Sequence, residues 1–522
     1  MSNQAVVAKS MLAPRPSSQE SIRVIVTHLG APMSDQILRT ILKRFSVESC
    51  ISVCQIKCHV PFVGADRQLW IPSTLVKWGE YDTDWDEITP IGADLVENMR
   101  HCESVYMDML TRLEERQTLS YQVRKRAYLK SLQYWNHILD TWKINLYLSS
   151  GIPHESHDYI IYSLCKFKGV PTIFVHAGAV KEEHCVLEDW EESAAQIPDV
   201  LKRLREEYAD PHKMIVLNDK YTRFLEAQVA SSRTAPVPWD MENSFSGPLT
   251  KKVQRIASVY KRGVGNFMNH VWRFYVRLCH PKHWIASLDR MRRVLLVRRM
   301  VRFYDQHAVE PDLTKPFVYF PLQMQPECST TPMAGAFTDQ ILIAKMLSGL
   351  LPDEVLLYIK EHPNQSRQYP DGRGRELFFY KDLLDLNRVR FVSRGYNSFD
   401  LLTHCMAVAT GTGTVGMEAL FKEKPVLLFG HTFTQYASGV FQVDSVESCR
   451  KALRAIFENG AKPTIRESAL FLRALQEVSV PGVFDREYKK ESSDMTFDES
   501  VASMSSAYIE RIRKYFPESA HS

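Results

Sequence analysis

Short apolar runs alternate along this chain with longer segments whose apolar residues recur at helical spacing. Apolar runs bounded by glycine, proline or polar residues are typical of buried strands. We expect such strands at Ser21–Leu29, Ile144–Leu148, Thr172–Val175, Phe317–Leu322, Val355–Ile359, Arg390–Ser393, Met406–Ala409 and Val426–Phe429. Because strands that alternate with helices form helix-covered parallel sheets, the pattern predicts an α/β protein.

Helical periodicity follows the first strand and returns later in the chain. Ser34–Phe45 is predicted as a helix with Ser34 as its N-cap, a position that serine favours. Residues 93–142 predict one or two longer helices that cover the sheet, with charges on their outer faces. Beyond about Glu467 we expect helices that close the second half of the protein.

The stretch Cys405–Tyr436 predicts a strand, a turn rich in glycine and threonine, a helix at Val415–Lys422 and a second strand. Such a turn lies at the carboxyl edge of a parallel sheet, where ligands bind. Glycines let a ligand approach closely, and a helix start favours phosphate. We therefore predict phosphate contacts from Thr412, Gly413 and Thr414, and ribose contacts from Glu418. The alternative is an ordinary tight turn with a solvent-facing glutamate.

A second strand–helix–strand pattern spans Ile144–Ala179 and places polar residues after its first strand. His154, Glu155 and Asp158 fall there, and a histidine or carboxylate at such an edge can deprotonate a hydroxyl group. The alternative is that the acidic residues only cap the helix, since they are favoured in a first turn.

Polar residues also follow the other predicted strands of the C-terminal half. Gln325 follows Phe317–Leu322, His362 follows Val355–Ile359, and Arg394 follows Arg390–Ser393. Carboxyl ends of parallel strands meet at one edge of a sheet, which is how an open α/β sheet builds a nucleotide site. This repetition is stronger evidence than any single motif.

Length, charge and the distribution of apolar runs narrow the class of protein. The 522 residues are enough for two domains, and 65 basic against 61 acidic residues do not indicate a general nucleic-acid binder. No apolar run approaches the length of about 20 residues that spans a bilayer. The first twenty residues lack the apolar core of a signal peptide, so we expect a cytoplasmic protein.

Two clusters of residues could suggest a metal site. Cys50, Cys54 and Cys58, with His59, fit one face of a strand better than a zinc pattern. The acidic stretch Tyr81–Ile88 contains carboxylates of the kind that hold a divalent ion on a diphosphate, but acidic loop clusters are usually solvated. We therefore predict no metal ligands and no cofactor.

A proline-, serine- and glycine-rich stretch, Pro236–Pro248, is expected to be a linker or exposed loop, and the strongly basic segment 251–302 follows it. Aromatic residues are interleaved with the arginines and lysines at helical spacing. This composition is typical of a segment that lies on an anionic membrane surface. The alternatives are a solvated helical insert whose aromatics pack on the main domain, and a nucleic-acid patch, for which no binding module is recognisable.

Three motifs together resemble the capsule polysaccharide biosynthesis family: QMQPE at Gln323–Glu327, KEHP at Lys360–Pro363, and the stretch Cys405–Tyr436. The family includes bacterial enzymes that transfer Kdo from a CMP-linked donor, and it belongs with the GT-B glycosyltransferases. The resemblance covers about 317–443 and, more weakly, 145–179, and the basic segment has no counterpart that we can identify.

The resemblance implies two Rossmann-like domains that face a cleft, with a basic helical insert. The expected divisions are 1–20 (disordered leader), 21–235 (acceptor side), 236–315 (linker and insert), 316–466 (nucleotide-sugar side) and 467–522 (C-terminal helices). A nucleotide sugar would be the donor and a glycan or glycolipid the acceptor. His362 would neutralise the leaving group, Gln325 would orient the nucleotide, and His154, Glu155 or Asp158 would be the base.

The implied activity is a metal-independent glycosyl transfer in capsule or surface polysaccharide synthesis, at the inner face of the plasma membrane. A sugar-nucleotide 2-epimerase would share the nucleotide half but needs no acceptor. A non-catalytic scaffold of a polysaccharide export assembly would keep the fold without turnover.

Overall fold

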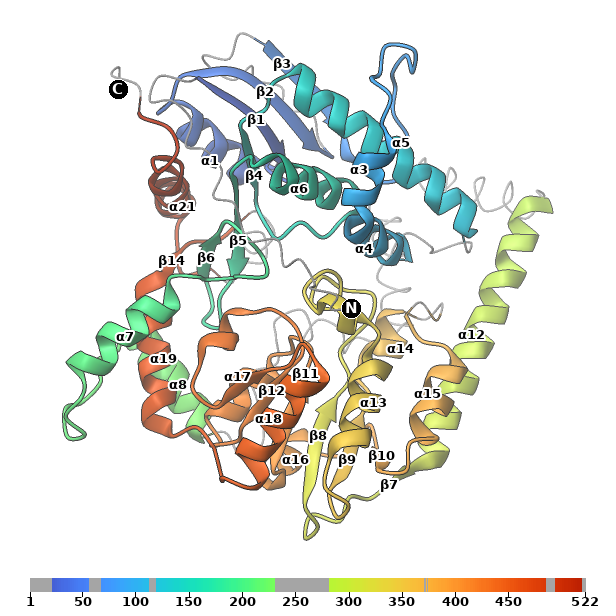
Figure 1. Ribbon diagram of the computed structural model, residues 1–522, viewed down its shortest axis with the longest axis vertical. Coiled ribbons are helices and arrows are strands. Elements are labelled where there is room, and N and C mark those ends of the chain that lie inside the picture. Colours follow the sequence, from blue (N-terminus) through green and yellow to red (C-terminus); the bar gives the residue numbers. More distant parts are fainter. Residues whose placement is uncertain are drawn as a thin grey trace, which may run out of the picture.

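The computed structural model describes residues 21–55, 67–111, 119–230, 281–369, 372, 374–484 and 493–518. It contains two sheets of seven strands, each covered by helices on both faces (Figure 1). The predicted α/β class with two Rossmann-like domains is therefore confirmed. The apolar strands pair in the centre of each sheet, where water is excluded from both faces.

The N-terminal sheet has the order β14-β6-β5-β4-β1-β2-β3. The five consecutive strands from β5 to β3 are parallel, whereas β6 and β14 at the other edge are antiparallel to their neighbours. The strands are β1 (Ile22–Thr27), β2 (Val47–Cys54), β3 (Arg67–Pro72), β4 (Leu146–Ser149), β5 (Thr172–Ala177), β6 (Glu183–Leu187) and β14 (Ser479–Pro481).

Helices cover this sheet on both faces. One face packs on α1 (Pro32–Leu42) and α21 (Phe497–Ile512). The other packs on α4 (Arg100–Leu110), α5 (Tyr121–Thr141) and α6 (Ser156–Lys168). The short helices α2 (Ser73–Val76) and α3 (Ala93–Asn98) also belong to this domain, whereas α7 (Ile197–Glu207) and α8 (Asp219–Ala230) pack on α19.

The N-cap predicted for the first helix is wrong by one turn. The helix α1 begins at Pro32, and its N-cap is Ala31. Ser34 lies three residues further on, where its Oγ accepts a hydrogen bond from the Ala31 amide at 3.1 Å. Proline fixes a helical φ and has no amide hydrogen to satisfy, so it suits the first helical position. It therefore moves the start of the helix ahead of the serine.

The C-terminal sheet is parallel throughout, in the order β13-β12-β11-β8-β9-β10-β7. The strands are β7 (Ala308–Val309), β8 (Phe317–Pro321), β9 (Leu356–Lys360), β10 (Val389–Val392), β11 (Ala407–Thr410), β12 (Val426–Leu428) and β13 (Val440–Gln442). The helices are α12 (Pro281–His307), α13 (Gln340–Leu350), α14 (Gln365–Gln368), α15 (Leu377–Leu384), α16 (Ser398–His404), α17 (Val415–Leu420), α18 (Val446–Phe457) and α19 (Ile465–Val478).

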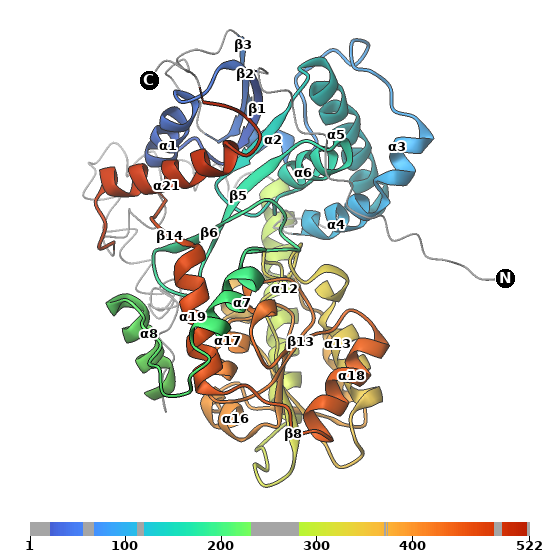
Figure 2. The same ribbon diagram turned by 60° about the vertical axis from the view of Figure 1, so that its left-hand side comes forward.

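The end of the chain returns to the N-terminal domain instead of closing the second one. The helix α21 packs along α1, and β14 pairs with β6 at the edge of the N-terminal sheet (Figure 2). The buried side chains of α21, including Val501, Met504 and Ile512, belong to the same core as those of α1. The predicted division at residue 467 falls within α19, which begins at Ile465 and contacts α7 and α8.

The carboxyl edges of both sheets lie at the contact between the domains. His176, at the end of β5, has its ring centroid 6.0 Å from that of Phe433, which follows β12. The ring centroid of Trp190 in the N-terminal domain likewise lies 5.4 Å from that of His431 in the C-terminal domain. Because β5 is parallel to β4 and β1, and β12 to β11, the ends of these strands face the partner domain. In the described residues, no helix is long and apolar enough to cross a membrane.

Candidate active site

The C-terminal sheet reverses its strand order between β8 and β11, and such a switch point opens a crevice for ligands. Gln323 follows β8, and Thr412 follows β11. The Oε1 atom of Gln323 accepts a hydrogen bond from the Thr412 amide at 3.0 Å, and its Nε2 donates to the Thr412 hydroxyl at 3.0 Å. The threonine-glycine turn is therefore fixed by a glutamine from the neighbouring strand.

The glycines of this turn make room for protein groups. A Cβ at Gly411 would collide with Oε1 of Gln323, and one at Gly413 would lie 2.8 Å from Oγ1 of Thr410. The Gly413 amide also donates to Oγ1 of Thr410 at 2.9 Å. The sequence predicted that these glycines admit a ligand, but the close approach that they permit in the structure is that of Gln323 and Thr410.

Thr414 is the N-cap residue of α17, and Glu418 lies one helical turn further on. The Thr414 hydroxyl, which is exposed, donates to Oε1 of Glu418 at 3.2 Å. Burial raises the pKa of Glu418, and the hydrogen bond from Thr414 offsets part of this shift. The helix α17 has six residues, two fewer than predicted. A half-buried carboxylate beside an exposed hydroxyl can accept the two hydroxyls of a ribose.

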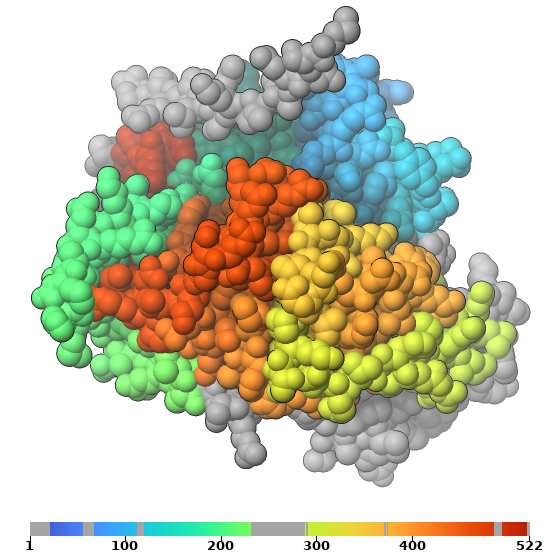
Figure 3. Space-filling model, turned by 60° about the horizontal axis from the view of Figure 1, so that its bottom comes forward, coloured from blue at the N-terminus to red at the C-terminus, as the bar shows by residue number. Residues whose placement is uncertain are grey.

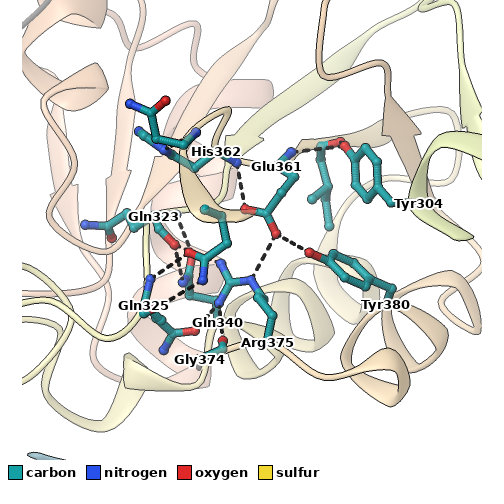
Figure 4. A network of polar contacts seen from close by, with 12 residues as sticks. Tyr304, Gln323, Gln325, Gln340, Glu361, His362, Gly374, Arg375 and Tyr380 are labelled. Carbon is teal, nitrogen blue, oxygen red and sulfur yellow. Dashed lines mark hydrogen bonds and ion pairs between the residues drawn. The ribbon is translucent and has the colours of Figure 1, made fainter. Parts of the chain in front are cut away.

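His362 and Glu361 follow β9. The Nδ1 atom of His362 accepts a hydrogen bond from the Asn364 amide at 3.2 Å, so the neutral ring carries its proton on Nε2. The His362 amide donates to Oε1 of Glu361 at 2.6 Å. The Glu361 side chain is buried, and it holds the loop that presents the histidine ring (Figure 4).

Gln325 and Arg394 are occupied by protein partners. The Gln325 side chain donates to the carbonyl of Thr338 and accepts from Arg375. Arg394 forms a bidentate ion pair with Asp305 of α12, at 2.9 and 2.8 Å. The hydrogen bonds to Asp305 raise the pKa of Arg394. The predicted nucleotide contacts of these two side chains therefore require either backbone atoms or an exchange of partners.

The N-terminal sheet has its own switch point, between β1 and β4. His28 follows β1, and its Nε2 lies 2.8 Å from Oδ2 of Asp158 at the start of α6. The other carboxylate oxygen of Asp158 accepts from the Glu155 amide at 2.7 Å. Asp158 is fully buried, whereas the His28 side chain is 26% exposed. Asp158 thus caps the helix, as the alternative interpretation expected, and also orients a histidine.

The pKa shifts of both His28 and Asp158 favour the charged form of the pair. Burial alone would lower the pKa of His28, but its hydrogen bond to Asp158 and the charge of Asp158 raise it above the usual value. Burial likewise would raise the pKa of Asp158, and the hydrogen bond and charge of His28 lower it. A histidine oriented by a buried carboxylate is the arrangement that activates hydroxyl nucleophiles in enzymes.

Two further histidines surround this pair. The His154 ring stacks near that of His28, with 5.9 Å between centroids, and its Nδ1 donates to the Ile152 carbonyl at 2.7 Å. In the neutral ring, Nε2 is therefore the acceptor atom. His157 is fully buried, and burial lowers its pKa to about 4, so it is neutral near pH 7. Glu155 is the N-cap residue of α6.

Sequence reasoning missed His28 and Arg375. Only a weak signal for His28 was present, because the predicted strand Ser21–Leu29 included it, whereas β1 ends at Thr27 and leaves His28 at the edge. No local pattern marks Arg375, whose contacts come from distant segments.

The positions of the cysteine cluster and of the acidic stretch Tyr81–Ile88 do not support a metal site at either place. Cys50 and Cys54 are buried in β2, and Cys58 and His59 lie outside the described residues. Asp82, Asp84 and Asp86 are exposed. Within the described parts of the chain, no group of three or more histidine, cysteine or acidic side chains is arranged to hold a metal ion.

Residues 250–452 match the model of the family described as capsule polysaccharide biosynthesis protein. The match includes all three motifs, so the resemblance is confirmed for this part of the chain, which is less than half of it. The match also takes in 251–302, for which no counterpart in the family was expected. It does not include 145–179, where a weaker resemblance was predicted. No functionally curated protein matches the chain significantly.

Several solved structures resemble the chain in topology at low identity. The KpsC β-Kdo 2,7 transferase of Thermosulfurimonas dismutans is 10% identical, with a TM-score of 0.29, over 75% of this chain and 91% of that one. The UDP-GlcNAc 2-epimerase of Methanocaldococcus jannaschii is 10% identical, with a TM-score of 0.23, over 88% of this chain and 100% of that one. A glycosyltransferase of Rickettsia africae is 8% identical, with a TM-score of 0.22, over 95% of this chain and 98% of that one. Scores this low leave the function to be argued from the chain's own side chains.

Proposed function

We propose that this protein is a glycosyltransferase that moves a sugar from a nucleotide-activated donor to a glycan or glycolipid in surface polysaccharide synthesis. The observation that carries the proposal is the pair of switch points. Gln323 and Thr412 order one, His28 and Asp158 order the other, and both lie at the edges where the domains meet. A transferase needs two substrates, and the two switch points would give it one site for each.

The C-terminal switch point is proposed to hold the donor. Thr412, Gly413 and Thr414 would face its phosphates, and Glu418 its ribose. His362, with its proton on Nε2, would donate to the departing phosphate and so stabilise the charge that develops there. We propose that this chemistry needs no bound metal, since positioned donors can perform the electrostatic task. A CMP-linked sugar is the donor that the family resemblance favours.

The N-terminal switch point is proposed to activate the acceptor hydroxyl. Among the predicted candidates, Asp158 is buried and bonded on both oxygens, and Glu155 caps the helix. His154 keeps an acceptor nitrogen in its neutral ring, and His28 is oriented by Asp158. We therefore propose that His28 or His154 takes the proton, with Asp158 as the residue that orients His28.

The first experiment is a thermal-shift panel of CMP, UMP, UDP, GDP and CDP on the wild type and on Glu418→Ala. A nucleotide at 100 times its dissociation constant stabilises a protein by about 2.7 kcal/mol. Stabilisation by one nucleotide, lost in the variant, supports the donor site. No stabilisation by any nucleotide supports the non-catalytic scaffold. Turnover of a nucleotide sugar without any acceptor would instead identify a 2-epimerase.

We also propose that the protein acts peripherally on an anionic membrane, such as the inner face of the plasma membrane, through 251–302. Of this segment, the structure describes the part within α12, which runs along the surface of the C-terminal domain (Figure 3). Leu288, Met291 and Leu295 share one face at helical spacing and are 57%, 57% and 56% exposed. Exposed arginines lie beside and beyond them: Arg292, Arg298, Arg299 and Arg302.

Exposed apolar side chains flanked by arginines match the chemistry of an anionic bilayer surface. Co-sedimentation with phosphatidylcholine vesicles, with and without phosphatidylglycerol, tests this proposal. Binding is expected only with the anionic lipid and should be lost when Leu288, Met291 and Leu295 are changed to serine. Met214→Ser, at a residue 84% exposed outside α12, is the control. Equal binding to both vesicles, or none, would contradict the proposal.

A further inference from the structure

Arg375 is a buried arginine that contacts two of the predicted donor-site loops of the C-terminal domain, those after β8 and β9. Its side chain is 2% exposed and forms an ion pair with Glu361, which is 4% exposed, at 3.0 Å. Its other guanidinium nitrogens donate to the Gln325 side chain, to the Gly374 carbonyl at 2.9 Å and to the Gln323 carbonyl at 2.8 Å. Figure 4 shows these contacts converging on one guanidinium group.

The contacts of Arg375 continue into the groups that are proposed to bind the donor. Glu361 accepts the His362 amide at 2.6 Å, so the ion pair holds the loop that carries the histidine. Gln323 binds Thr412 through both ends of its amide group. One side chain thus connects the loops after β8 and β9 directly, and the turn after β11 through a single intermediate.

The surroundings of Arg375 are built to keep it in place. Gly374 has a φ of +76°, and a Cβ there would collide with the Gln325 backbone, so this glycine permits the close approach. Tyr380 donates to Glu361 at 2.6 Å, and Tyr304 of α12 accepts the Glu361 amide at 3.0 Å. Both oxygens of the Glu361 carboxylate therefore have donors, Oε1 from the His362 amide and Oε2 from Arg375 and Tyr380.

Stability alone is a weak reason to bury such a pair. Removing two charges from water costs several kcal/mol per ion, and well-packed apolar replacements are often as stable. An arginine fork does what an apolar side chain cannot, because it fixes the relative positions of several acceptors at once.

We propose that Arg375 is a positioning residue of the donor site, which holds the loops of Gln323, Gln325 and His362 in the arrangement that binds the nucleotide. The proposal rests on the proposed function, since it concerns that same site. Arg375 itself lies below the loops and is not expected to contact the donor. Its effect should therefore appear in donor affinity, through the geometry of His362 and Thr412.

The test compares the dissociation constant of the nucleotide found in the thermal-shift panel across a small set of variants. The double variant Arg375→Met/Glu361→Gln removes both charges without leaving either buried alone. It is expected to bind the nucleotide at least 10-fold more weakly, which is about 1.4 kcal/mol. Arg375→Lys keeps the charge but loses the fork and should not restore affinity. Tyr380→Phe, which removes one partner of Glu361, should fold and give a smaller loss.

Arg388→Met is the matched control. Arg388 also binds carbonyls and an aspartate, at Ser348, Pro352 and Asp353, but it precedes β10 at the opposite edge of the sheet. It should lower thermal stability without changing nucleotide affinity. Unchanged affinity in folded Arg375 and Tyr380 variants would overturn the positioning role. If the wild type binds no nucleotide, the donor-site proposal fails instead.

Discussion

The side chain of Gln323 pairs with both the amide and the hydroxyl of Thr412, 89 residues away in the chain. Both distances are 3.0 Å, so a single amide group satisfies a turn that the sequence presents as glycine-rich and open. These contacts hold the turn in one conformation, and a turn held in place lowers the entropy that ligand binding must remove.

Gln323→Ala is expected to disorder this turn. The variant leaves the Thr412 amide without its partner in a largely buried position, at a cost of about 1–3 kcal/mol. We expect a lower unfolding temperature together with weaker nucleotide binding, measured by calorimetry. Gln435→Ala, which removes an amide that contacts the backbone of Glu191 and Glu192 at the domain contact, is the control and should leave nucleotide affinity unchanged. Equal affinities for wild type and Gln323→Ala would contradict the role of the pair.

Gly411→Ala tests the same contact from the other side. The added methyl group would displace Gln323, so nucleotide affinity and stability should both fall. Gly349→Ala is a control with the same chemical change, since no atom lies within 4 Å of a Cβ there and the residue is inside α13. It should stabilise the protein by up to about 1 kcal/mol, the helix preference of alanine over glycine. Tolerance of Gly411→Ala would mean that the turn is looser than the structure shows.

The pH dependence of the transfer rate should follow the deprotonation of His28. A base must be neutral, and the pKa of His28 is raised, so the rate should increase with pH through this raised value. Asp158→Asn removes the charge that raises it. The midpoint should therefore move to lower pH, with a lower maximal rate. A midpoint that does not move in Asp158→Asn would exclude His28 and favour His154.

The same pair predicts how stability varies with pH. The lowered pKa of Asp158 adds stability above the unfolded carboxyl pKa, which is lost on acidification through the folded value. The raised pKa of His28 adds stability below the unfolded histidine pKa, which is lost as pH rises through the folded value. The difference in unfolding free energy between wild type and Asp158→Asn should thus be largest between about pH 4 and pH 6.5. Urea titrations across this range measure it, and a difference independent of pH would show that the pair is not ionic.

Nucleotide affinity should weaken on acidification because of Glu418. Its pKa is raised by burial, so the carboxylate takes up a proton at a higher pH than an exposed glutamate does, and it then loses acceptor capacity. Thr414→Val removes the hydrogen bond that lowers this pKa, so the loss should begin at a still higher pH. Glu418→Gln should bind more weakly and without this pH dependence. A pH-dependent Glu418→Gln would assign the effect to another group.

Local patterns in the chain were enough to predict the elements and the edges at which they present polar residues. Strands such as Ala407–Thr410 and Val426–Leu428 were predictable because apolar periodicity and turn residues act over a few neighbouring positions. Gln325, His362 and Thr412 could be placed at strand ends for the same reason.

Which of these residues meet depends on the order of the strands and on contacts between distant segments. His28 and Asp158 are 130 residues apart in the chain, and Arg375 donates to Gln323, from which it is separated by 52 residues. The return of α21 to α1 likewise depends on two apolar faces that fit each other. Such contacts depend on sheet order and on the burial of complementary surfaces, and neither leaves a periodic signal along the chain. The sequence therefore marked the edges of the sheets, and folding selected the partners.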